Sequence, residues 1–96
     1  MTTFAVTYHY ADEPERLDAV RPEHRAFLGR LHESGELIAS GPYPDTGGGQ
    51  ALLILQGEDD SDVLAALDGD PFRREGLIER REVHDWNVVI GSIGGA

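Results

Sequence analysis

Cysteine is absent from this sequence of 96 residues, so disulfide bonds, thiolate catalysis and thiolate metal ligands are excluded. Basic residues are also scarce: eight Lys and Arg stand against eighteen Asp and Glu, a formal net charge of −10. Such a negative chain is poorly suited to binding nucleic acids or anionic membranes. No apolar run approaches the ~18–20 residues that span a bilayer, and the first residues lack the features of a signal peptide. We therefore expect a cytoplasmic protein without nucleic-acid or membrane partners.

Motifs that hold cofactors or metals are lacking as well. The glycine run at residues 47–49 has no following helix or Lys, unlike a phosphate-binding loop. Neither Ser40 nor Gly41 belongs to a nucleophile-elbow pattern. The acidic run at residues 58–60 lacks the alternating ligands of a calcium loop, and the histidines and acids show no zinc-ligand spacing. We expect no cofactor and no metal.

Four segments have the character of strands. Phe4, Val6 and Tyr8 alternate with smaller or more polar neighbours, the period of two that is typical of a strand. Further strands are predicted over residues 36–43 and 51–55, and a long final strand is predicted within residues 78–90.

The first helix is predicted in two pieces. Asp12 and Glu15 resemble a capping box, which indicates a short helical piece ending near residue 20. Pro22 has the backbone angle suited to a first helical position, so it predicts a helix start with a break or kink before it. Gly35 is expected to end this helix as a left-handed cap.

The second helix is predicted after residue 60, with Ser61 as its N-cap. The order of elements is then β-α-β-β-α-β, which we assign to one domain over residues 1–96, with 91–96 as a loose tail. Two short helices cover only one face of a four-stranded sheet, whereas residues 52–55 and 86–90 are apolar on both faces. A second copy of the chain is the economical cover, which predicts a homodimer with its sheets packed face to face.

His24 is the most informative side chain in the sequence. It follows Pro22 by two positions, and Phe27 and Leu28 share its helical phase, so the ring should lie in the first turn and face the interior. The remaining histidines have ordinary structural or solvated roles; these are His9, His32 and His84. A buried imidazole needs a polar partner, and a backbone carbonyl would satisfy it as a purely structural residue. A carboxylate would instead orient the ring for acid–base chemistry.

The residues alone leave the identity of that carboxylate open. Asp70 precedes Pro71, and a simple role for it is to cap the following turn. Asp68 is a close competitor, and Glu23 adjoins His24 but should point off the helix in a different direction.

Four short segments in this order along the chain resemble the YciI-related (YCII domain) family. They are Arg-Pro-Glu-His at 21–24, the stretch at 31–37 that contains Gly-Glu-Leu, Ser-Gly-Pro at 40–42 and Asp-Pro-Phe at 70–72. The resemblance covers nearly the whole chain. It departs from the family in a short, glycine-rich second hairpin and in Gly29, which interrupts the first helix.

The resemblance implies an α+β, ferredoxin-like fold with a four-stranded antiparallel sheet, of the dimeric α/β barrel type. It also implies a pocket centred on a histidine–aspartate pair, which falls on His24 and Asp70. The residues that fall near this pocket as substrate contacts are Arg21, Ser40, Gly41, Pro42 and Phe72.

The leading hypothesis is a small cofactor-independent enzyme in which His24 is the general acid or base and Asp70 orients it. Arg21 would hold an anionic group of a small ring or carbonyl compound. Isomerisation, elimination or hydrolysis would suit such a site, by analogy with other dimeric α/β barrels. Two alternatives remain: a non-catalytic small-ligand-binding or regulatory module, and a cofactor-free monooxygenase.

Overall fold

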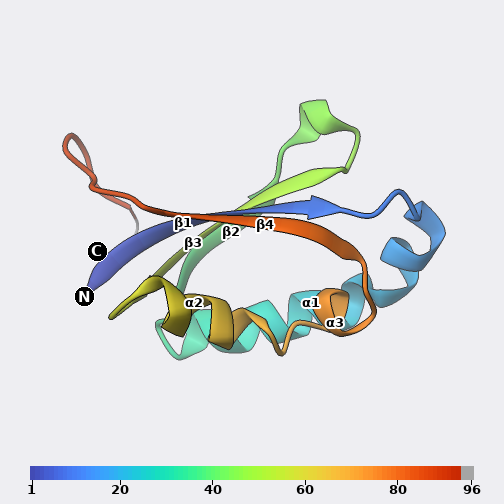
Figure 1. Ribbon diagram of the computed structural model, residues 1–96, viewed down its shortest axis with the longest axis horizontal. Helices are drawn as coiled ribbons and strands as arrows, with labels where there is room; N and C mark the ends of the chain where they lie inside the picture. The colour runs from blue at the N-terminus through green and yellow to red at the C-terminus, as the bar shows by residue number, and fades with distance from the viewer. Residues whose placement is uncertain (94–96) are drawn as a thin grey trace.

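The computed structural model describes residues 1–93. It consists of a four-stranded antiparallel sheet with helices covering one face (Figure 1). The strands are β1 (Thr2–Tyr10), β2 (Leu37–Pro42), β3 (Gln50–Gly57) and β4 (Ile78–Asp85). Their spatial order is β2-β3-β1-β4, and every neighbouring pair is antiparallel. The predicted α+β, ferredoxin-like arrangement is confirmed.

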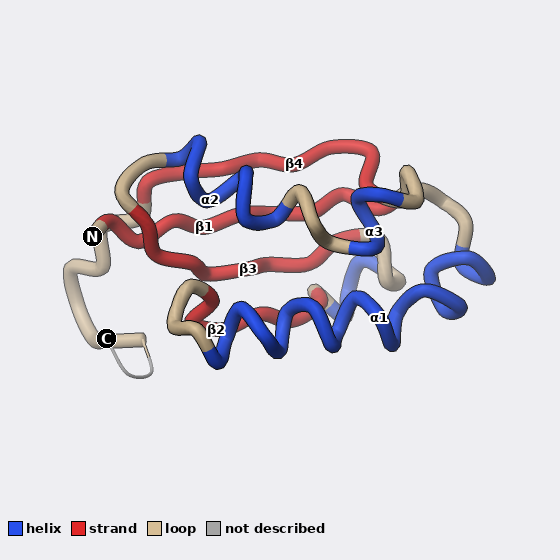
Figure 2. Tube along the Cα trace, turned by 90° about the horizontal axis from the view of Figure 1, so that it is seen from below, coloured by secondary structure: helices blue, strands red, loops and turns tan. Residues whose placement is uncertain are grey.

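The helical layer places its elements side by side beneath the sheet. Its helices are α1 (Pro14–Glu33), α2 (Asp60–Leu67) and α3 (Pro71–Arg74), and a 3-10 turn, η1 (Pro44–Thr46), lies in the β2–β3 connection. Figure 2 shows α1 running along the β2 side, α2 along the β4 side and α3 between them. None of the helices among the described residues is both long and apolar enough to cross a membrane.

The core lies between the sheet and this layer. Phe4, Val6 and Tyr8 point from β1 toward the helices and are buried. In the antiparallel register Phe4 pairs with Leu55 and Val6 pairs with Leu53, so the same face of β3 continues the core. The alternation predicted for β1 is therefore confirmed.

The first helix is continuous, which corrects the prediction of a new start at Pro22. It begins with Pro14 at its first position, after Glu13, whose side chain makes no capping bond, and so the expected capping box does not form. Pro22 lies inside the helix, and Figure 1 shows the first turns tilted away from the rest. A proline removes one backbone hydrogen bond and bends a helix, but apolar residues in phase on both sides keep the segment helical. His24 therefore lies mid-helix and away from the helix dipole's positive end.

The end of α1 follows the prediction. Gly35 has a φ of 89°, its N–H bonds to the carbonyl of His32, and the N–H of Glu36 bonds to the carbonyl of Leu31. These two bonds define a Schellman motif, which satisfies carbonyls that the helix itself leaves free. The left-handed cap at Gly35 is confirmed.

The N-cap of α2 differs from the prediction. It is Asp59, whose Oδ1 accepts the N–H of Asp62 at 2.9 Å and the hydroxyl of Ser61 at 2.7 Å. Ser61 thus lies inside the first turn and supports the cap. The hydrogen bonds from Ser61 and Asp62 hold the pKa of Asp59 below its ordinary value.

The final strand is shorter than predicted. β4 ends at Asp85, opposite Phe4, and the N–H of Trp86 makes a last bond to the carbonyl of Thr3. Because β1 begins at Thr2, later residues have no partner strand for their backbone groups. Val89 and Ile90 are accordingly 81% and 93% exposed. Of the tail predicted at 91–96, residues 91–93 have no helix or strand, and 94–96 lie outside the described residues.

Candidate functional site

His24 and Asp70, which are 46 residues apart, meet inside the protein. His24 Nδ1 lies 2.8 Å from Oδ1 and 2.9 Å from Oδ2 of Asp70. The histidine is 7% exposed and the aspartate 0% exposed. Packing of α1 against α3 brings the two together, because Asp70 immediately precedes α3. The contact that the family resemblance implied is therefore present.

The other candidate carboxylates lie elsewhere. Asp68 is exposed and forms ion pairs with Arg73 at 3.2 Å and with Arg81 at 3.0 Å. Glu23 is exposed on the outer side of α1. Asp70 is thus the one among the three carboxylates that the fold brings to His24.

Asp70 also caps α3, so its structural role and its contact with His24 coexist. Its Oδ1 accepts the N–H of Phe72 at 2.9 Å, and its Oδ2 accepts the hydroxyl of Tyr8 at 3.1 Å. Pro71 occupies the first helical position, which needs no N–H partner. Donors on three sides therefore fix the carboxylate in one orientation.

Tyr8 is a member of this network that the sequence analysis missed. Burial, followed by the negative charge of Asp70 and the hydrogen bond to it, raises the pKa of Tyr8 above its ordinary range. Tyr8 therefore stays neutral and acts as a hydrogen-bond donor. A sequence signal existed, because a tyrosine on the core face of a strand requires a partner for its hydroxyl.

The imidazole of His24 is fixed on both its face and its edge. Its ring stacks on Phe72, with centroids 4.0 Å apart and planes 15° from parallel. Because an ionised carboxylate only accepts hydrogen bonds, Nδ1 carries the proton that faces Asp70. Nε2 makes no hydrogen bond with residues 1–93. Every buried side-chain nitrogen or oxygen in that part of the chain has a hydrogen-bond partner, so Nε2 is not one of the buried atoms. Nε2 is therefore accessible from the cavity that His24 lines.

That cavity lies between α1, the sheet and α3 and has a volume of about 420 Å³. Its walls include each residue predicted as a substrate contact, namely Arg21, Ser40, Gly41, Pro42 and Phe72. Asp70 lies behind His24 and outside the walls. Arg21 forms an ion pair with Asp18, one turn earlier on α1. Arg25 and Tyr10 also line the cavity, and the sequence analysis did not single them out.

Burial and the charge of Asp70 raise the pKa of Tyr10 to about 12, with burial the larger cause. The ring of Tyr10 packs edge-on against Phe72, with centroids 5.3 Å apart. Tyr10 thus presents a neutral hydroxyl and an aromatic ring to the site near neutral pH.

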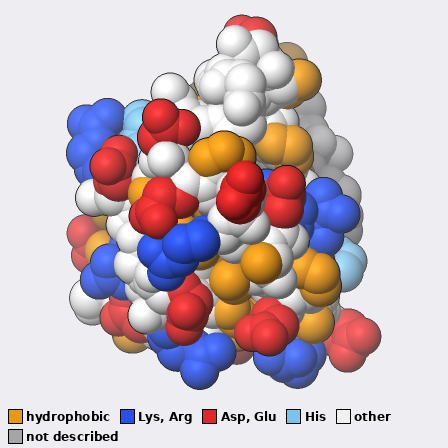
Figure 3. All heavy atoms as spheres, turned by 90° about the vertical axis from the view of Figure 1, so that its right-hand side faces the viewer, with side chains coloured by type: hydrophobic (Ala, Val, Ile, Leu, Met, Phe, Trp, Pro, Cys, Tyr) orange, Lys and Arg blue, Asp and Glu red, His pale blue; other side chains and the backbone are white. Residues whose placement is uncertain are grey.

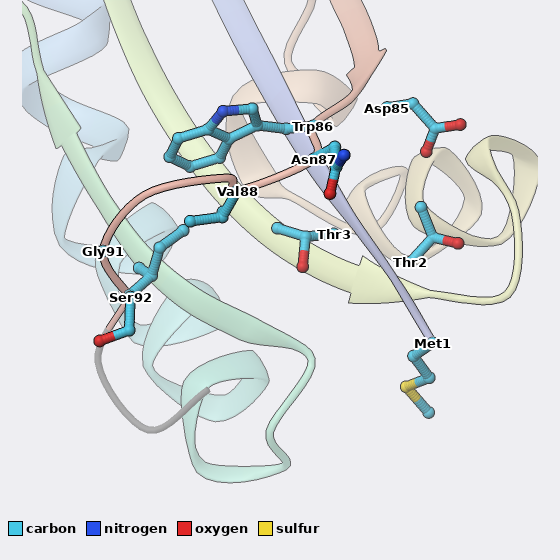
Figure 4. A pocket seen from close by; sticks show the side chains of 10 residues that line it. Met1, Thr2, Thr3, Asp85, Trp86, Asn87, Val88, Gly91 and Ser92 are labelled. Carbon is cyan, nitrogen blue, oxygen red and sulfur yellow. The ribbon is translucent and has the colours of Figure 1, made fainter.

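A larger hollow of about 710 Å³ lies where β1 begins and β4 ends. Figure 4 shows Thr3, Trp86 and Asn87 around it. Asp85 is the only acid or base among the side chains of its described lining, and no histidine belongs to it. Of these two hollows, the smaller one at His24 is therefore the one whose described lining includes an imidazole.

The remaining histidines have the structural or exposed positions expected of them. His9 Nε2 lies 2.7 Å from Glu82 Oε2 on the sheet face away from the helices, and this bond holds the pKa of Glu82 below its ordinary value. His32 Nδ1 donates to the carbonyl of Leu37 at 2.9 Å, and His84 is exposed on β4. Across residues 1–93, no three His, Asp or Glu side chains converge as a metal site would require.

Comparisons with known proteins agree with this fold. A family model described as YCII-related domain matches residues 1–87. Protein YciI of Escherichia coli O6:H1 and Protein YciI of Shigella flexneri are each 32% identical over 87 residues, covering 82% of this chain and 89% of theirs. A solved structure, 5-chloro-2-hydroxyhydroquinone dehydrochlorinase (TftG) from Burkholderia phenoliruptrix in complex with 2,5-dihydroxybenzoquinone, is similar with a TM-score of 0.74. It is 20% identical and covers 88% of this chain and 93% of its own, a likeness that shows the fold.

Proposed function

We propose that this chain, which belongs to the YCII-related domain family, is a small-molecule enzyme in which His24 is the general acid–base. One observation supports this above all: His24 Nε2 has no hydrogen-bond partner among the described residues and opens on the cavity, whereas Nδ1 is held by a buried carboxylate. An imidazole with one nitrogen oriented and the other accessible is suited to proton transfer.

The proposed proton path uses only side chains of this chain. The Nδ1 proton points to Asp70, so Nε2 has the free lone pair and accepts a proton from a bound substrate. The imidazolium that forms lies 2.8 Å from the Asp70 carboxylate, whose negative charge stabilises it. Nε2 then returns the proton to another atom of the substrate or of its product. Isomerisation and elimination use such a transfer, and in hydrolysis the proton that Nε2 accepts comes from the attacking water and passes to the leaving group.

The size and walls of the cavity favour a small ring or carbonyl compound. About 420 Å³ lies within the range of small-molecule sites, and Leu28, Leu53 and Phe72 provide apolar walls. The structurally similar dehydrochlorinase has a small ring compound, 5-chloro-2-hydroxyhydroquinone, in its name, which supports this choice of substrate class. The two arginines on the cavity walls, Arg21 and Arg25, would interact with an anionic group.

Substitution of the pair tests the proposal once a panel of ring and carbonyl compounds, including hydroxyhydroquinones, yields a turned-over substrate. We expect His24→Gln to lower kcat by about 10²–10⁴-fold, since general acid–base catalysis contributes that much. Asp70→Asn should also lower kcat, because the ring loses the negative charge that stabilises its cation.

Asp68→Asn is the matched control. It removes an exposed carboxylate two residues from Asp70 and should retain activity. Circular dichroism verifies that each variant folds. Unchanged turnover in His24→Gln would refute the acid–base assignment. Binding without turnover across the panel would favour a non-catalytic module, and oxygen uptake during turnover would favour a monooxygenase.

We further propose that a second copy of the chain covers the sheet face that the helices leave open. Leu52 and Ile54 point to this face, because their neighbours Leu53 and Leu55 pair with residues that face the helices. Leu52 is partly exposed on this face, although Ile54 is already buried within the chain. An exposed apolar side chain favours association, and a two-fold dimer is the commonest arrangement.

A further inference from the structure

The cavity at His24 is adjoined by a second recess between α1 and β2, which we call the annex. Its volume is about 340 Å³, and it shares Arg25, Leu28 and Ser40 with the cavity. The rest of its lining comes from Gly29 and His32 on α1 and from residues 37–39 on β2. Because three lining residues are common to both, one elongated ligand can occupy the two spaces together.

Gly29 keeps the annex open. No atom lies within 4 Å of the position that a Cβ at Gly29 would take. A glycine in the middle of a helix is destabilising relative to alanine, so its presence there is unfavourable for the helix itself. The absent side chain leaves free space one turn beyond Arg25, on the α1 wall of the annex.

The walls of both spaces carry only basic or neutral side chains within the described residues. The basic side chains of these walls are Arg21, Arg25, His24 and His32, and no Asp or Glu of residues 1–93 belongs to them. The chain as a whole has eighteen acidic residues against eight Lys or Arg. The outer surface is different: Figure 3 shows acidic and basic side chains interspersed on the end of the molecule where α1 begins. The described linings of the cavity and annex are thus without acidic side chains in a strongly negative protein.

Arg25 is the cation available to a ligand. Arg21 is paired with Asp18, whereas Arg25 makes no ion pair or hydrogen bond with residues 1–93. A further recess that also borders Arg21 is lined by Asp12, Glu13 and Asp18, which would repel an anion. Electrostatics therefore favours an anionic group on the Arg25 side, toward the annex.

We infer that the substrate carries a carboxylate, which the Arg25 guanidinium binds at the junction of the cavity and the annex while the reacting part lies beside His24. This inference rests on the proposed function and adds the chemical class of the substrate. One planar guanidinium matches a planar carboxylate through two parallel hydrogen bonds. A phosphate would fit less well, because the interior of α1 offers no free backbone N–H groups and the net charge disfavours a dianion.

Ligand titrations followed by NMR on the ¹⁵N-labelled full chain test the inference with three probes: salicylate, its neutral analogue salicylamide, and phenyl phosphate. Salicylate should shift the Arg25 Nε and Gly29 amide signals and bind at least about tenfold more tightly than salicylamide. Equal affinity for the two, absence of salicylate binding, or tighter binding of phenyl phosphate at the same signals would overturn it.

Substitutions locate the binding residue. Arg25→Gln should weaken salicylate binding by about tenfold and leave salicylamide unaffected. Arg30→Gln is the matched control, because Arg30 is exposed on the same helix and lies outside both linings. Gly29→Leu should weaken salicylate binding by filling the annex, whereas Gly29→Ala should preserve it. Loss of binding in Arg30→Gln equal to that in Arg25→Gln would also refute the assignment.

These results are separable from the test of the proposed function. His24→Gln should retain the preference for salicylate over salicylamide while turnover is lost. A preference for carboxylates in a parent protein that turns over no compound of the panel would refute the acid–base proposal alone. Turnover that depends on His24 but shows no preference for a carboxylate would refute the Arg25 assignment alone.

Discussion

Asp70 shows how a single residue combines a local and a long-range role. Its carboxylate caps the first turn of α3 and also holds Nδ1 of His24, while Tyr8 donates to its second oxygen. A buried carboxylate is stable only when donors satisfy it, and here donors from β1, α1 and α3 do so. Removing Asp70 would therefore disturb both the helix start and the orientation of the imidazole.

At the same scale, Tyr10 gives a prediction for alkaline pH. Its pKa is raised to about 12 in the folded chain by burial and by Asp70, whereas an unfolded tyrosine ionises near pH ~10. The unfolded state therefore loses its proton first. This contribution to stability is fully present below about pH 10 and is lost as the pH rises toward about 12.

Urea unfolding near neutral pH and at about pH 11 measures this effect. The free energy of unfolding should fall at the higher pH, and Tyr10→Phe should reduce that fall. Part of the fall should persist in the variant, because the pKa of Tyr8 is raised as well. An alkaline loss of the same size in Tyr10→Phe and the parent protein would contradict the prediction.

At the scale of elements, α1 is the helix that carries the site. His24 and Arg25 sit mid-helix, after the bend that begins near Pro22 and before Gly29. The helix ends in a Schellman motif at Gly35, whose backbone lies in the left-handed region. Glycine therefore serves a different purpose at each position: Gly29 leaves open space beside the helix, and Gly35 adopts a left-handed backbone angle.

The same substitution at these two glycines should have opposite effects. Gly35→Ala should lower the free energy of unfolding by about 1–2 kcal/mol, because a Cβ strains the left-handed backbone. Gly29→Ala should raise it by up to about 1 kcal/mol, since alanine is the better helix former and meets no atom within 4 Å. Urea unfolding at neutral pH measures both, and changes of the same sign would contradict this account.

At the scale of the whole molecule, residues 1–93 form a sheet with helices on one face only (Figure 1). The organisation as one domain over residues 1–96 stays a prediction, as does the dimer. Leu52, which is partly exposed on the face that the helices leave open, is the structural reason to expect a second copy.

Light scattering at micromolar concentration tests the dimer. The parent protein should have twice the chain mass of 10.5 kDa. Leu52→Glu places a charge on the open face and should give a folded monomer, because burying an unpaired carboxylate is unfavourable. Val89→Glu, at a position 81% exposed beyond β4, should remain dimeric. A monomeric parent protein would exclude the proposed assembly.

Local patterns predicted much of the fold but misplaced several boundaries. The alternation along β1 and the cap at Gly35 follow from properties of single residues and were predicted. The helix start at Pro22 was wrong because tertiary packing on both sides keeps α1 continuous, whereas the tilt of its first turns agrees with the kink that was the other expectation. The end of β4 was also wrong, because a strand requires a partner and β1 begins at Thr2.

The sequence by itself determined the element types, the inward phase of His24 and the absence of any thiol, since these depend on composition and on spacing along the chain. Only the tertiary structure decided which carboxylate meets His24, because Asp68 and Asp70 differ in where α3 places them. It also decided that Tyr8 donates to Asp70 and that Arg25 borders the cavity. Contacts between β1, α1 and α3 arise from packing, and no local pattern encodes them.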